Sequence, residues 1–591
     1  MKSRHYTCAF AICITLLLSG PAGRVCAQEN DAAPNPNAVP WGIASSSSAV
    51  RNHGEWFPKV FDVGVRWVRM FPEWRNLEPK EGTWKWDSLD AMLKDAADQK
   101  IEINGLLMGS TPWVKGGAHA FPMSHLSQWS DFVSAVVDRY KNQIHYWEIW
   151  NEGNGGFNDN HNSTADYANL VAASYAAAKK SDPNAQVGMT VASFDAPYLN
   201  QAFIEMAKAE KANSFDYLCI HPYEIAEHVL EPHGEIPYLW MTHILRHILK
   251  ANAPERANAE IWITEVGLRV EKRVTDADAA KGLVKIYTMA LAQGIKHTFW
   301  FEAQDPVGED QGFGLLARAG TPRASYNSFK IMTKCLGLTP KYIGWIQTGA
   351  AGDGYGFVFD GVGGPVLTAW MPSGATGASP AFTGDVQVVD VLSGEATALK
   401  AGQPFELTDK PVFVTGLPAD FVAKAQANAG KNFPWGGDYS AANAVSIQLG
   451  AAAPENAGIF PVGMKSLPVY KFPDGSTGIE IQKNESTTFY VHPSFADFST
   501  RDYYVRVTTR RIGPGNVGMN FNYEIADSKG RGAYKNKGEW YSLSEDTGWQ
   551  THTWHVTDAC FSKMWAYDFN FRPEQSVPFV IGKVEVSKTP F

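Results

Sequence analysis

The stretch Tyr146-Trp147-Glu148-Ile149-Trp150-Asn151-Glu152 is a short apolar run that closes on a carboxylate. A second run, Glu260-Ile261-Trp262-Ile263-Thr264-Glu265-Val266-Gly267, carries a glutamate in the same way near its end. Isoleucine and tryptophan are enriched in buried strands. Carboxylates at the C-terminal ends of two barrel strands converge over one pocket. The two runs therefore predict strands that bring Glu152 and Glu265 together.

Six further apolar runs flank these two, and segments with helical spacing lie between them. One such segment places apolar side chains at i, i+3, i+4 and i+7 from Trp129 to Tyr140. Eight strands alternating with helices predict an α/β fold, a (β/α)8 TIM barrel over residues 39–338. Glu152 then ends the fourth strand and Glu265 ends the seventh. The six further runs are 41–43, 65–70, 101–107, 187–191, 217–220 and 298–301.

A pair of carboxyl groups is what the hydrolysis of a glycosidic bond requires, one to protonate the leaving oxygen and one to attack or to activate water. Burial among Trp and Ile side chains is expected to raise the pKa of Glu152, which suits a general acid. The amide of Asn151 is placed to bond a sugar hydroxyl. Glu148 lies deeper along the same strand and is expected to pair with an interior cation, and Arg69, in an apolar strand, needs an acidic partner.

Several motifs carry a family resemblance. They are Asn151-Glu152 on the fourth strand, Glu265 on the seventh, Trp74, Glu78-Pro79, Gly82, Trp84 and Trp86-Asp87 after the second, Pro112-Trp113 after the third, and His221-Pro222-Tyr223 after the sixth. On these residues the region 39–417 resembles the retaining glycoside hydrolases of clan A. Within the clan it looks most like glycoside hydrolase family 39, which includes β-xylosidases, α-iduronidases and exopolysaccharide hydrolases.

The resemblance implies a double displacement with Glu152 as acid/base and Glu265 as nucleophile. It also implies that Arg69 lies near the nucleophile and that His221 and Tyr223 line the site. Trp300, and less directly Trp113, would stack on a sugar ring; the alternative for both is core packing. The implied partner is a polysaccharide or an oligosaccharide, and the mechanism needs no metal or cofactor.

The region after the barrel is rich in short β-like runs separated by turns. Residues 339–417 are predicted to form a small β-sandwich side domain, residues 418–432 a linker, and residues 433–591 a C-terminal β jelly roll. The jelly roll resembles carbohydrate-binding modules in its closing strands. Its candidate exposed aromatics are Trp435, Trp540, Tyr541 and Trp565, and a purely structural role for them stays open.

Residues 1–27 are predicted to be an export signal. They begin with the basic residues Lys2 and Arg4, continue with an apolar stretch from Ala9 to Leu18, and have small residues at the cleavage site. Residues 28–38 are predicted to be a disordered lead-in. The mature protein is expected to be secreted or periplasmic. A lipid anchor on Cys26 is not expected, because the charged Arg24 stands where such signals have apolar or small residues.

The formal net charge of −9 argues against nucleic acid and against an anionic membrane surface as partners. No segment after the signal is expected to span a membrane. Three cysteines remain in the mature chain, Cys219, Cys335 and Cys560, and their spacing fits neither a disulfide framework nor a zinc site. They are expected to be free thiols. The oligomeric state stays open.

Two rival interpretations remain at this point. The first is an exo-acting, β-xylosidase-like glycosidase in which the loop 153–162 shapes one end of the cleft. The second is a glycan-binding protein without catalytic activity on a barrel scaffold. The presence of both Glu152 and Glu265 favours an enzyme, because loss of one carboxylate is the simplest way to lose activity.

Overall fold

The structure is a computed structural model. It describes residues 35–46, 52–271, 273–306, 311–451, 455–463, 468–482, 486–498, 501–573 and 577–591. The predicted export signal and most of the predicted lead-in lie outside these residues. The last part of the lead-in forms a short 3-10 helix, η1 (Pro36–Ala38), and the indole of Trp67 donates a hydrogen bond to the Pro36 carbonyl.

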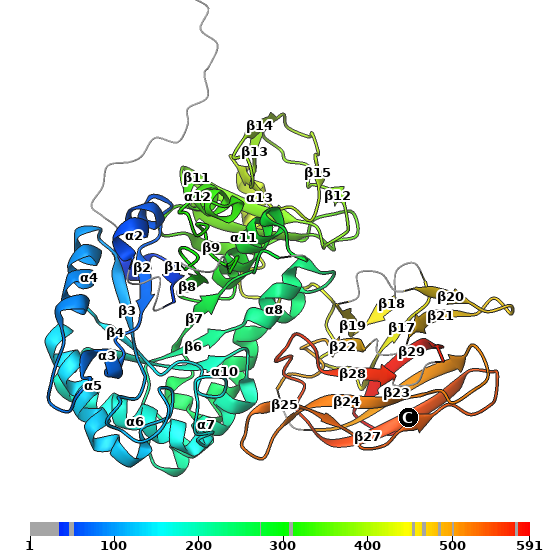
Figure 1. Ribbon diagram of the computed structural model, residues 1–591. Helices are drawn as coiled ribbons and strands as arrows, with labels where there is room; N and C mark the ends of the chain where they lie inside the picture. The colour runs from blue at the N-terminus through cyan, green and yellow to red at the C-terminus, as the bar shows by residue number, and fades with distance from the viewer. Residues whose placement is uncertain are drawn as a thin grey trace, which may run out of the picture. The chain divides into compact units, whose positions relative to one another are not determined.

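The first eight strands form a closed parallel barrel, as the eight apolar runs predict (Figure 1). Each strand pairs with its neighbour in sequence, and β1 closes the barrel on β8. The (β/α)8 fold is therefore confirmed. The strands are β1 (Trp41–Ala44), β2 (Trp67–Met70), β3 (Glu102–Leu107), β4 (Tyr146–Ile149), β5 (Gln186–Ala192), β6 (Tyr217–His221), β7 (Glu260–Val266) and β8 (Thr298–Phe301).

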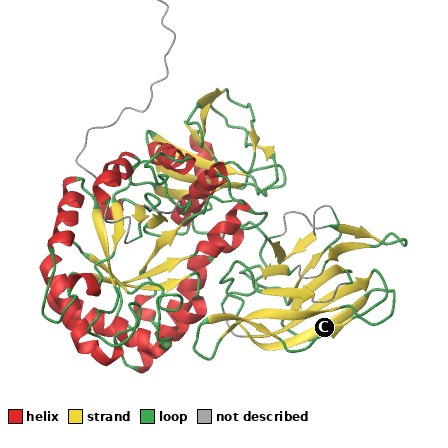
Figure 2. Ribbon diagram, viewed as in Figure 1, coloured by secondary structure: helices red, strands yellow, loops and turns green. Residues whose placement is uncertain are grey.

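The helices surround the barrel strands (Figure 2). Two of them begin with a capping box, in which Ser163 and Thr275 each exchange hydrogen bonds with an aspartate three residues later. The principal helices are α2 (His53–Asp62), α4 (Asp87–Asp98), α5 (Leu126–Tyr140), α6 (Thr164–Ser181), α7 (Ala196–Lys208), α10 (Met241–Asn252), α11 (Asp276–Ala292) and α12 (Ala324–Leu336). Short helical turns are α3 (Trp74–Leu77), α8 (Tyr223–Glu227) and α9 (Glu235–Leu239), with η2 (Met123–His125), η3 (His228–Leu230) and η4 (Pro254–Arg256).

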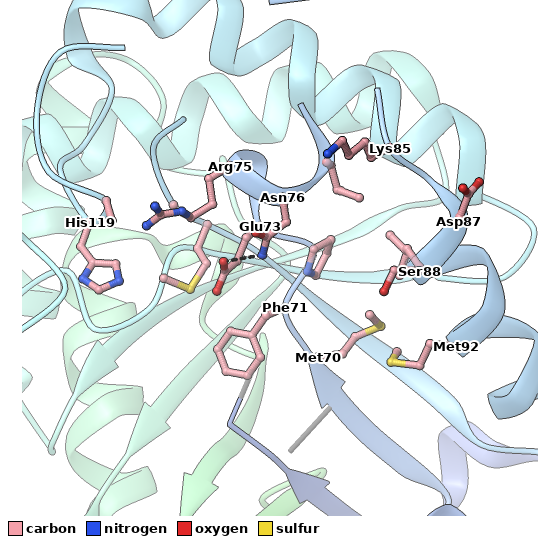
Figure 3. A pocket seen from close by; sticks show the side chains of 16 residues that line it. Met70, Phe71, Glu73, Arg75, Asn76, Lys85, Asp87, Ser88, Met92 and His119 are labelled. Carbon is pink, nitrogen blue, oxygen red and sulfur yellow. Dashed lines mark hydrogen bonds between the residues drawn. The ribbon is translucent and has the colours of Figure 1, made fainter. Parts of the chain in front are cut away.

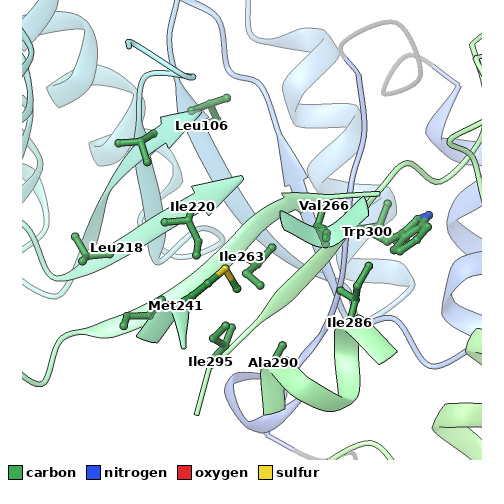
Figure 4. Packing of buried hydrophobic residues seen from close by; sticks show 14 of the residues in the cluster. Leu106, Leu218, Ile220, Met241, Ile263, Val266, Ile286, Ala290, Ile295 and Trp300 are labelled. Carbon is green, nitrogen blue, oxygen red and sulfur yellow. The ribbon is translucent and has the colours of Figure 1, made fainter. Parts of the chain in front are cut away.

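Two hydrophobic layers divide the barrel strands by the alternation of side chains along each strand. The inner layer contains Trp67, Tyr217, Trp262 and Phe299, with Phe301 packed against it. The outer layer faces the helices, and Figure 4 shows Trp300 there together with Ile286 of α11. Consecutive residues of β8 therefore belong to different layers.

The segment after the barrel forms a six-stranded antiparallel sheet in the order β14-β13-β16-β11-β10-β9, accompanied by the pair β12-β15. The predicted linker contains a helix, α13 (Ala419–Gln426), which packs against β9 and β10. The strands are β9 (Lys341–Trp345), β10 (Tyr355–Gly361), β11 (Gly364–Trp370), β12 (Gly377–Ala378), β13 (Val386–Asp390), β14 (Ala396–Leu399), β15 (Glu406–Leu407) and β16 (Val412–Thr415).

The C-terminal strands β17 to β29 form an antiparallel β unit with its own hydrophobic core. Its main path runs β18-β17-β29-β23-β27 and continues as β24-β28-β22-β19 through one residue pair, Ile525 with Ala559. The strands are β17 (Ala444–Gln448), β18 (Glu455–Ala457), β19 (Ile459–Val462), β20 (Val469–Lys471), β21 (Thr477–Ile481), β22 (Thr487–Val491), β23 (Arg501–Arg511), β24 (Gly518–Ala526), β25 (Gly532–Asn536), β26 (Tyr541–Ser542), β27 (Gln550–Ala559), β28 (Phe569–Pro573) and β29 (Phe579–Ser587).

The four candidate aromatics of this unit differ in exposure. Trp435 and Tyr541 are buried, Trp540 is partly buried, and Trp565 is 43% exposed and stacks on Tyr534. Within the described residues, no helix has the length and apolar character needed to cross a membrane. Cys219, Cys335 and Cys560 are not joined in disulfides, as expected.

Candidate active site

Glu152 and Glu265 lie close together at the C-terminal end of the barrel. A different local feature of the backbone positions each of them. The chain leaves β4 through a turn in which Trp150 and Glu152 both have left-handed backbone conformations, with φ values of 63° and 45°. On β7 the pairing register with β8 shifts between Ile263 and Val266, and such irregularities re-aim side chains. Thr264 and Glu265 consequently both reach the interior network. An oxygen of Glu152 and one of Glu265 lie within 4.8 Å of each other.

Arg69 of β2 lies beneath the carboxylate pair and is fully buried. Its Nε and one Nη donate to both oxygens of Glu148, at 2.8 and 2.9 Å. It also donates to a carboxylate oxygen of Glu265 and, over 2.8 Å, to Oδ1 of Asn151. Arg69 therefore holds the predicted nucleophile and the Asn151 amide in place, and Glu148 forms the expected interior ion pair.

The buried pair keeps both of its members charged. Burial raises the pKa of Glu148, but the positive charge and hydrogen bonds of Arg69 lower it more, so the net pKa is below its usual value. Burial also acts against the charge of Arg69, and the two carboxylates more than offset this, so the pKa of Arg69 is raised. A buried arginine with two anionic partners is a strong constraint on their positions.

Replacement of Arg69 by methionine is expected to destabilise the protein by about 3–5 kcal/mol, because Glu148 would remain as an uncompensated buried charge. The folded-state pKa of Glu148 is lowered, so its contribution to stability is present above its unfolded-state pKa and is lost as the pH falls through the folded-state value. Chemical denaturation of the wild type and of Arg69→Met at neutral pH measures the difference. The exposed pair Arg139–Asp90 provides the control, and Arg139→Met should change stability by less than about 1 kcal/mol.

His221, the last residue of β6, is buried and connects Glu152, after β4, with Thr264 of β7. Its Nδ1 is hydrogen-bonded to Glu152 over 2.8 Å and its Nε2 to the Thr264 hydroxyl over 3.0 Å. Burial raises the pKa of Glu152, but the hydrogen bond and charge of His221, together with the charge of Arg69, lower it more. The expected rise of the Glu152 pKa is therefore wrong for this structure, because a partner distant in sequence outweighs desolvation.

Tyr223 and Asn151 complete the contacts around the nucleophile. The Tyr223 hydroxyl donates to Glu265 over 3.1 Å. Burial, followed by the negative charges of Glu265 and Glu152, raises the pKa of Tyr223 far above its usual value, so this hydroxyl stays protonated as a donor. Asn151 is buried at the cavity wall, and since its oxygen accepts from Arg69, its NH2 group is left as the donor.

The structure does not bring the two predicted tryptophans to the carboxylates. Trp300 is fully buried and its indole donates to the Phe313 carbonyl over 3.1 Å. Trp113 donates to the Glu78 carbonyl and packs edge-on against Trp74, away from the described cavity walls. The aromatic Phe and Tyr residues that line the cavity with Glu152 and Glu265 are Phe71, Phe157, Tyr223, Phe301 and Phe313, and neither tryptophan is among them. The alternation of β8 explains the difference, because Phe301 shares the inner layer with Phe299 and Trp300 does not.

Glu152, His221 and Glu265 also have the composition of a metal-binding group, with one donor atom from each within 4.8 Å of the others. Their present partners account for this grouping. His221 bonds Glu152, and Glu265 accepts from Arg69 and Tyr223. A divalent ion would have to displace these bonds, and it would lie close to the Arg69 guanidinium, which is an unfavourable neighbour for a cation.

Two cavities meet at this end of the barrel. One has a volume of about 730 Å³ and contains Glu152 and Glu265. The other, of about 810 Å³, lies over β2 and α4, and Figure 3 shows Arg75 and His119 on one side of Glu73 and Lys85 on the other. The cavities share four lining residues, so they lie next to each other. The shared residues are Phe71, Glu73, Met108 and His119.

Comparisons with known proteins find a partial family match and similar folds among solved structures. The model of glycosyl hydrolase family 10 matches residues 71–220. Among curated proteins, none matches the sequence. A family 39 glycoside hydrolase from the gut symbiont Bacteroides cellulosilyticus WH2 shares 19% sequence identity, with a TM-score of 0.53 over 64% of this chain and 81% of that one.

Two other solved structures resemble the chain at lower scores. The family 39 enzyme from Xanthomonas axonopodis pv. citri has 15% identity and a TM-score of 0.49, over 65% of this chain and 94% of that one. A monomeric β-xylosidase from Caulobacter crescentus CB15 has 16% identity and a TM-score of 0.47, over 65% and 97%. The fold of the barrel is therefore similar to that of a family 39 glycoside hydrolase, and residues 71–220 match a glycosyl hydrolase family model.

Proposed function

We propose that this protein is an exported retaining glycoside hydrolase that cleaves O-glycosidic bonds of a polysaccharide or an oligosaccharide. The observation that carries the proposal is the separation of at most 4.8 Å between an oxygen of Glu152 and one of Glu265. Retaining enzymes place their two carboxyl groups about 5–5.5 Å apart, whereas inverting enzymes need about 6.5–9.5 Å to admit a water molecule. Export rests on the N-terminal sequence alone.

In the first step, Glu265 attacks the anomeric carbon as the bond to the leaving oxygen breaks. Glu152 delivers its proton to that oxygen, so the leaving sugar departs neutral and a glycosyl ester of Glu265 remains. Arg69 and Tyr223 orient Glu265 for this attack. The Asn151 amide is the donor placed for a sugar hydroxyl at the reacting ring.

In the second step, Glu152 has lost its proton and acts as the general base. It takes a proton from a water molecule, whose oxygen attacks the anomeric carbon and releases Glu265 as a carboxylate. Two inversions at the same carbon give net retention. The hydrogen bond from His221 holds Glu152 in one orientation during both steps and favours its ionised form.

His221→Ala is expected to move the alkaline limb of the pH profile of kcat/KM to higher pH. The substitution removes the groups that lower the pKa of Glu152 and leaves its burial, so Glu152 keeps its proton to a higher pH. Initial rates across the pH range measure the limb. His145→Ala, an exposed histidine at the start of β4, is the control and should leave the profile unchanged. A limb that stays in place, or moves to lower pH, would refute this role of His221.

The proposed function is tested by product release from a broad panel of polysaccharides and oligosaccharides, with product sizes resolved. The wild type should release products from at least one member, and Glu265→Ala from none. A distribution of product sizes would indicate endo action, which the two adjacent cavities favour. Release of single terminal sugars would indicate the exo-acting alternative. Binding of a panel member without release by the wild type would contradict the enzyme assignment and support the non-catalytic alternative.

A further inference from the structure

Glu224 is a carboxylate of the catalytic cavity that the proposed mechanism does not use. It lies on α8, immediately after the strand end that carries His221. One of its oxygens accepts a hydrogen bond from the Ser193 hydroxyl over 2.9 Å. The other oxygen is buried and has no hydrogen-bond partner. A buried acceptor without a partner is unfavourable in the free protein and gains a partner if a ligand supplies a hydroxyl.

The position of Glu224 relates it to the acid/base side of the cavity. Burial raises the pKa of Glu224, and the negative charge of Glu152 contributes to the increase. Ser193, which holds Glu224, follows Ala192, and the Ala192 backbone N–H donates over 2.8 Å to Oδ1 of Asn154, two residues after Glu152. Because Glu152 gives its proton to the leaving oxygen, groups beside it face the sugar that leaves rather than the sugar that becomes bound to Glu265.

The charge of this cavity restricts what binds there. Its lining contains five glutamates and, among the described residues, no lysine or arginine. A carboxylate or sulfate on the sugar would be repelled by these negative charges, whereas hydroxyl groups donate readily to carboxylates. The five are Glu73, Glu152, Glu224, Glu227 and Glu265.

We propose that Glu224 is a specificity-determining residue that binds a hydroxyl group of the leaving sugar through its unpartnered oxygen, and that this sugar is uncharged. The inference rests on the proposed function. It adds on which side of the cleaved bond Glu224 binds, and the chemical class of the sugar bound there. Ser193 acts as the positioning residue that fixes the carboxylate.

The test compares two substrates that differ only in the leaving group. One is the shortest oligosaccharide that the wild type cleaves, and the other is the 4-nitrophenyl glycoside of the same transferred sugar. Glu224→Ala should lower kcat/KM for the oligosaccharide by about 10- to 100-fold, the value of one hydrogen bond to a charged group. It should leave the nitrophenyl glycoside unchanged, because that leaving group has no sugar hydroxyl.

Glu224→Gln keeps an oxygen acceptor and should show a smaller loss on the oligosaccharide. Glu395→Ala, an exposed acid outside the barrel, is the matched control. An equal loss on both substrates would overturn the proposal, since a general structural defect or a contact with the transferred sugar would act on both. No loss on either would overturn it too. Thermal unfolding checks that each variant is folded. If Glu224→Ala does not fold, the comparison of the two substrates is made with Glu224→Gln.

A second comparison tests the charge of the sugar. The wild type should cleave an oligosaccharide with a neutral leaving sugar faster than one with a uronic acid there, and Glu224→Gln should narrow that difference. If the wild type cleaves neither, the proposed function fails, and calorimetric binding of the neutral oligosaccharide still decides the inference. Weaker binding by Glu224→Ala than by wild type supports it, and equal binding, or no binding by either, refutes it.

Discussion

Glu265→Ala is expected to reduce kcat by at least about 10,000-fold, because without the carboxylate no glycosyl ester forms. The neighbours of Glu265 remain in place: Arg69 keeps its bonds to Glu148 and Asn151, so the variant should fold. Glycan affinity should change little, since the loss falls on the transition state rather than on ground-state binding. Single-turnover kinetics and calorimetric titration with the best panel substrate separate these two effects.

Chemical rescue by a small anion tests whether the lost activity of Glu265→Ala is due to the missing carboxylate itself. A small anion such as azide fits the space left by the carboxylate and attacks the anomeric carbon from the same face, which gives a glycosyl azide of inverted configuration. Glu260→Ala, at the other end of the same strand and half-exposed, is the matched control and should retain activity. An active Glu265→Ala variant, or rescue of Glu260→Ala instead, would remove Glu265 from the role of nucleophile.

Glu152→Ala is expected to lose about 100- to 10,000-fold in kcat/KM on natural glycosides, which is the usual contribution of a general acid. The loss should nearly vanish for the first step with a nitrophenyl glycoside, because that leaving group departs without a proton. The second step should then be slow, since no base activates water. A burst of nitrophenol followed by slow turnover is the expected signal.

Azide also distinguishes Glu152 from Glu265. In Glu152→Ala, azide attacks the glycosyl ester of Glu265 and gives a product of retained configuration, whereas rescue of Glu265→Ala gives inversion. Equal losses on natural and nitrophenyl substrates, with no burst, would contradict the assignment of Glu152 as acid/base. The assignment would then pass to another carboxyl group of the cavity, such as Glu224, which accepts a hydrogen bond from Ser193.

The barrel could be predicted from the sequence because its signal is local. Each strand is an apolar run of a few residues, and the observed strands β4 and β7 fall within the runs that end near Glu152 and Glu265. The convergence of the two carboxylates follows from the topology of parallel barrels. The turn after β4 and the register shift on β7 could not be predicted, because both arise from how neighbouring strands pair.

The chemistry of the site depended on contacts distant in sequence. The lowered pKa of Glu152 comes from His221, which burial arguments about the β4 sequence alone do not include. The family resemblance implies Trp300 as a platform for the sugar ring, but strand alternation places Phe301 at the cavity instead. That alternation is visible in the sequence Thr298-Phe299-Trp300-Phe301, once Phe299 is assigned to the barrel interior. The unpartnered oxygen of Glu224 is likewise a property of the folded structure, and the local sequence does not predict it.

The measurement that tests the central claim most directly is the anomeric configuration of the first product, followed by proton NMR before mutarotation. A separation of at most 4.8 Å between oxygens of Glu152 and Glu265 predicts that the new reducing end keeps the configuration of the cleaved bond. A product of inverted configuration would show that water attacks directly, and would contradict the double displacement through Glu265.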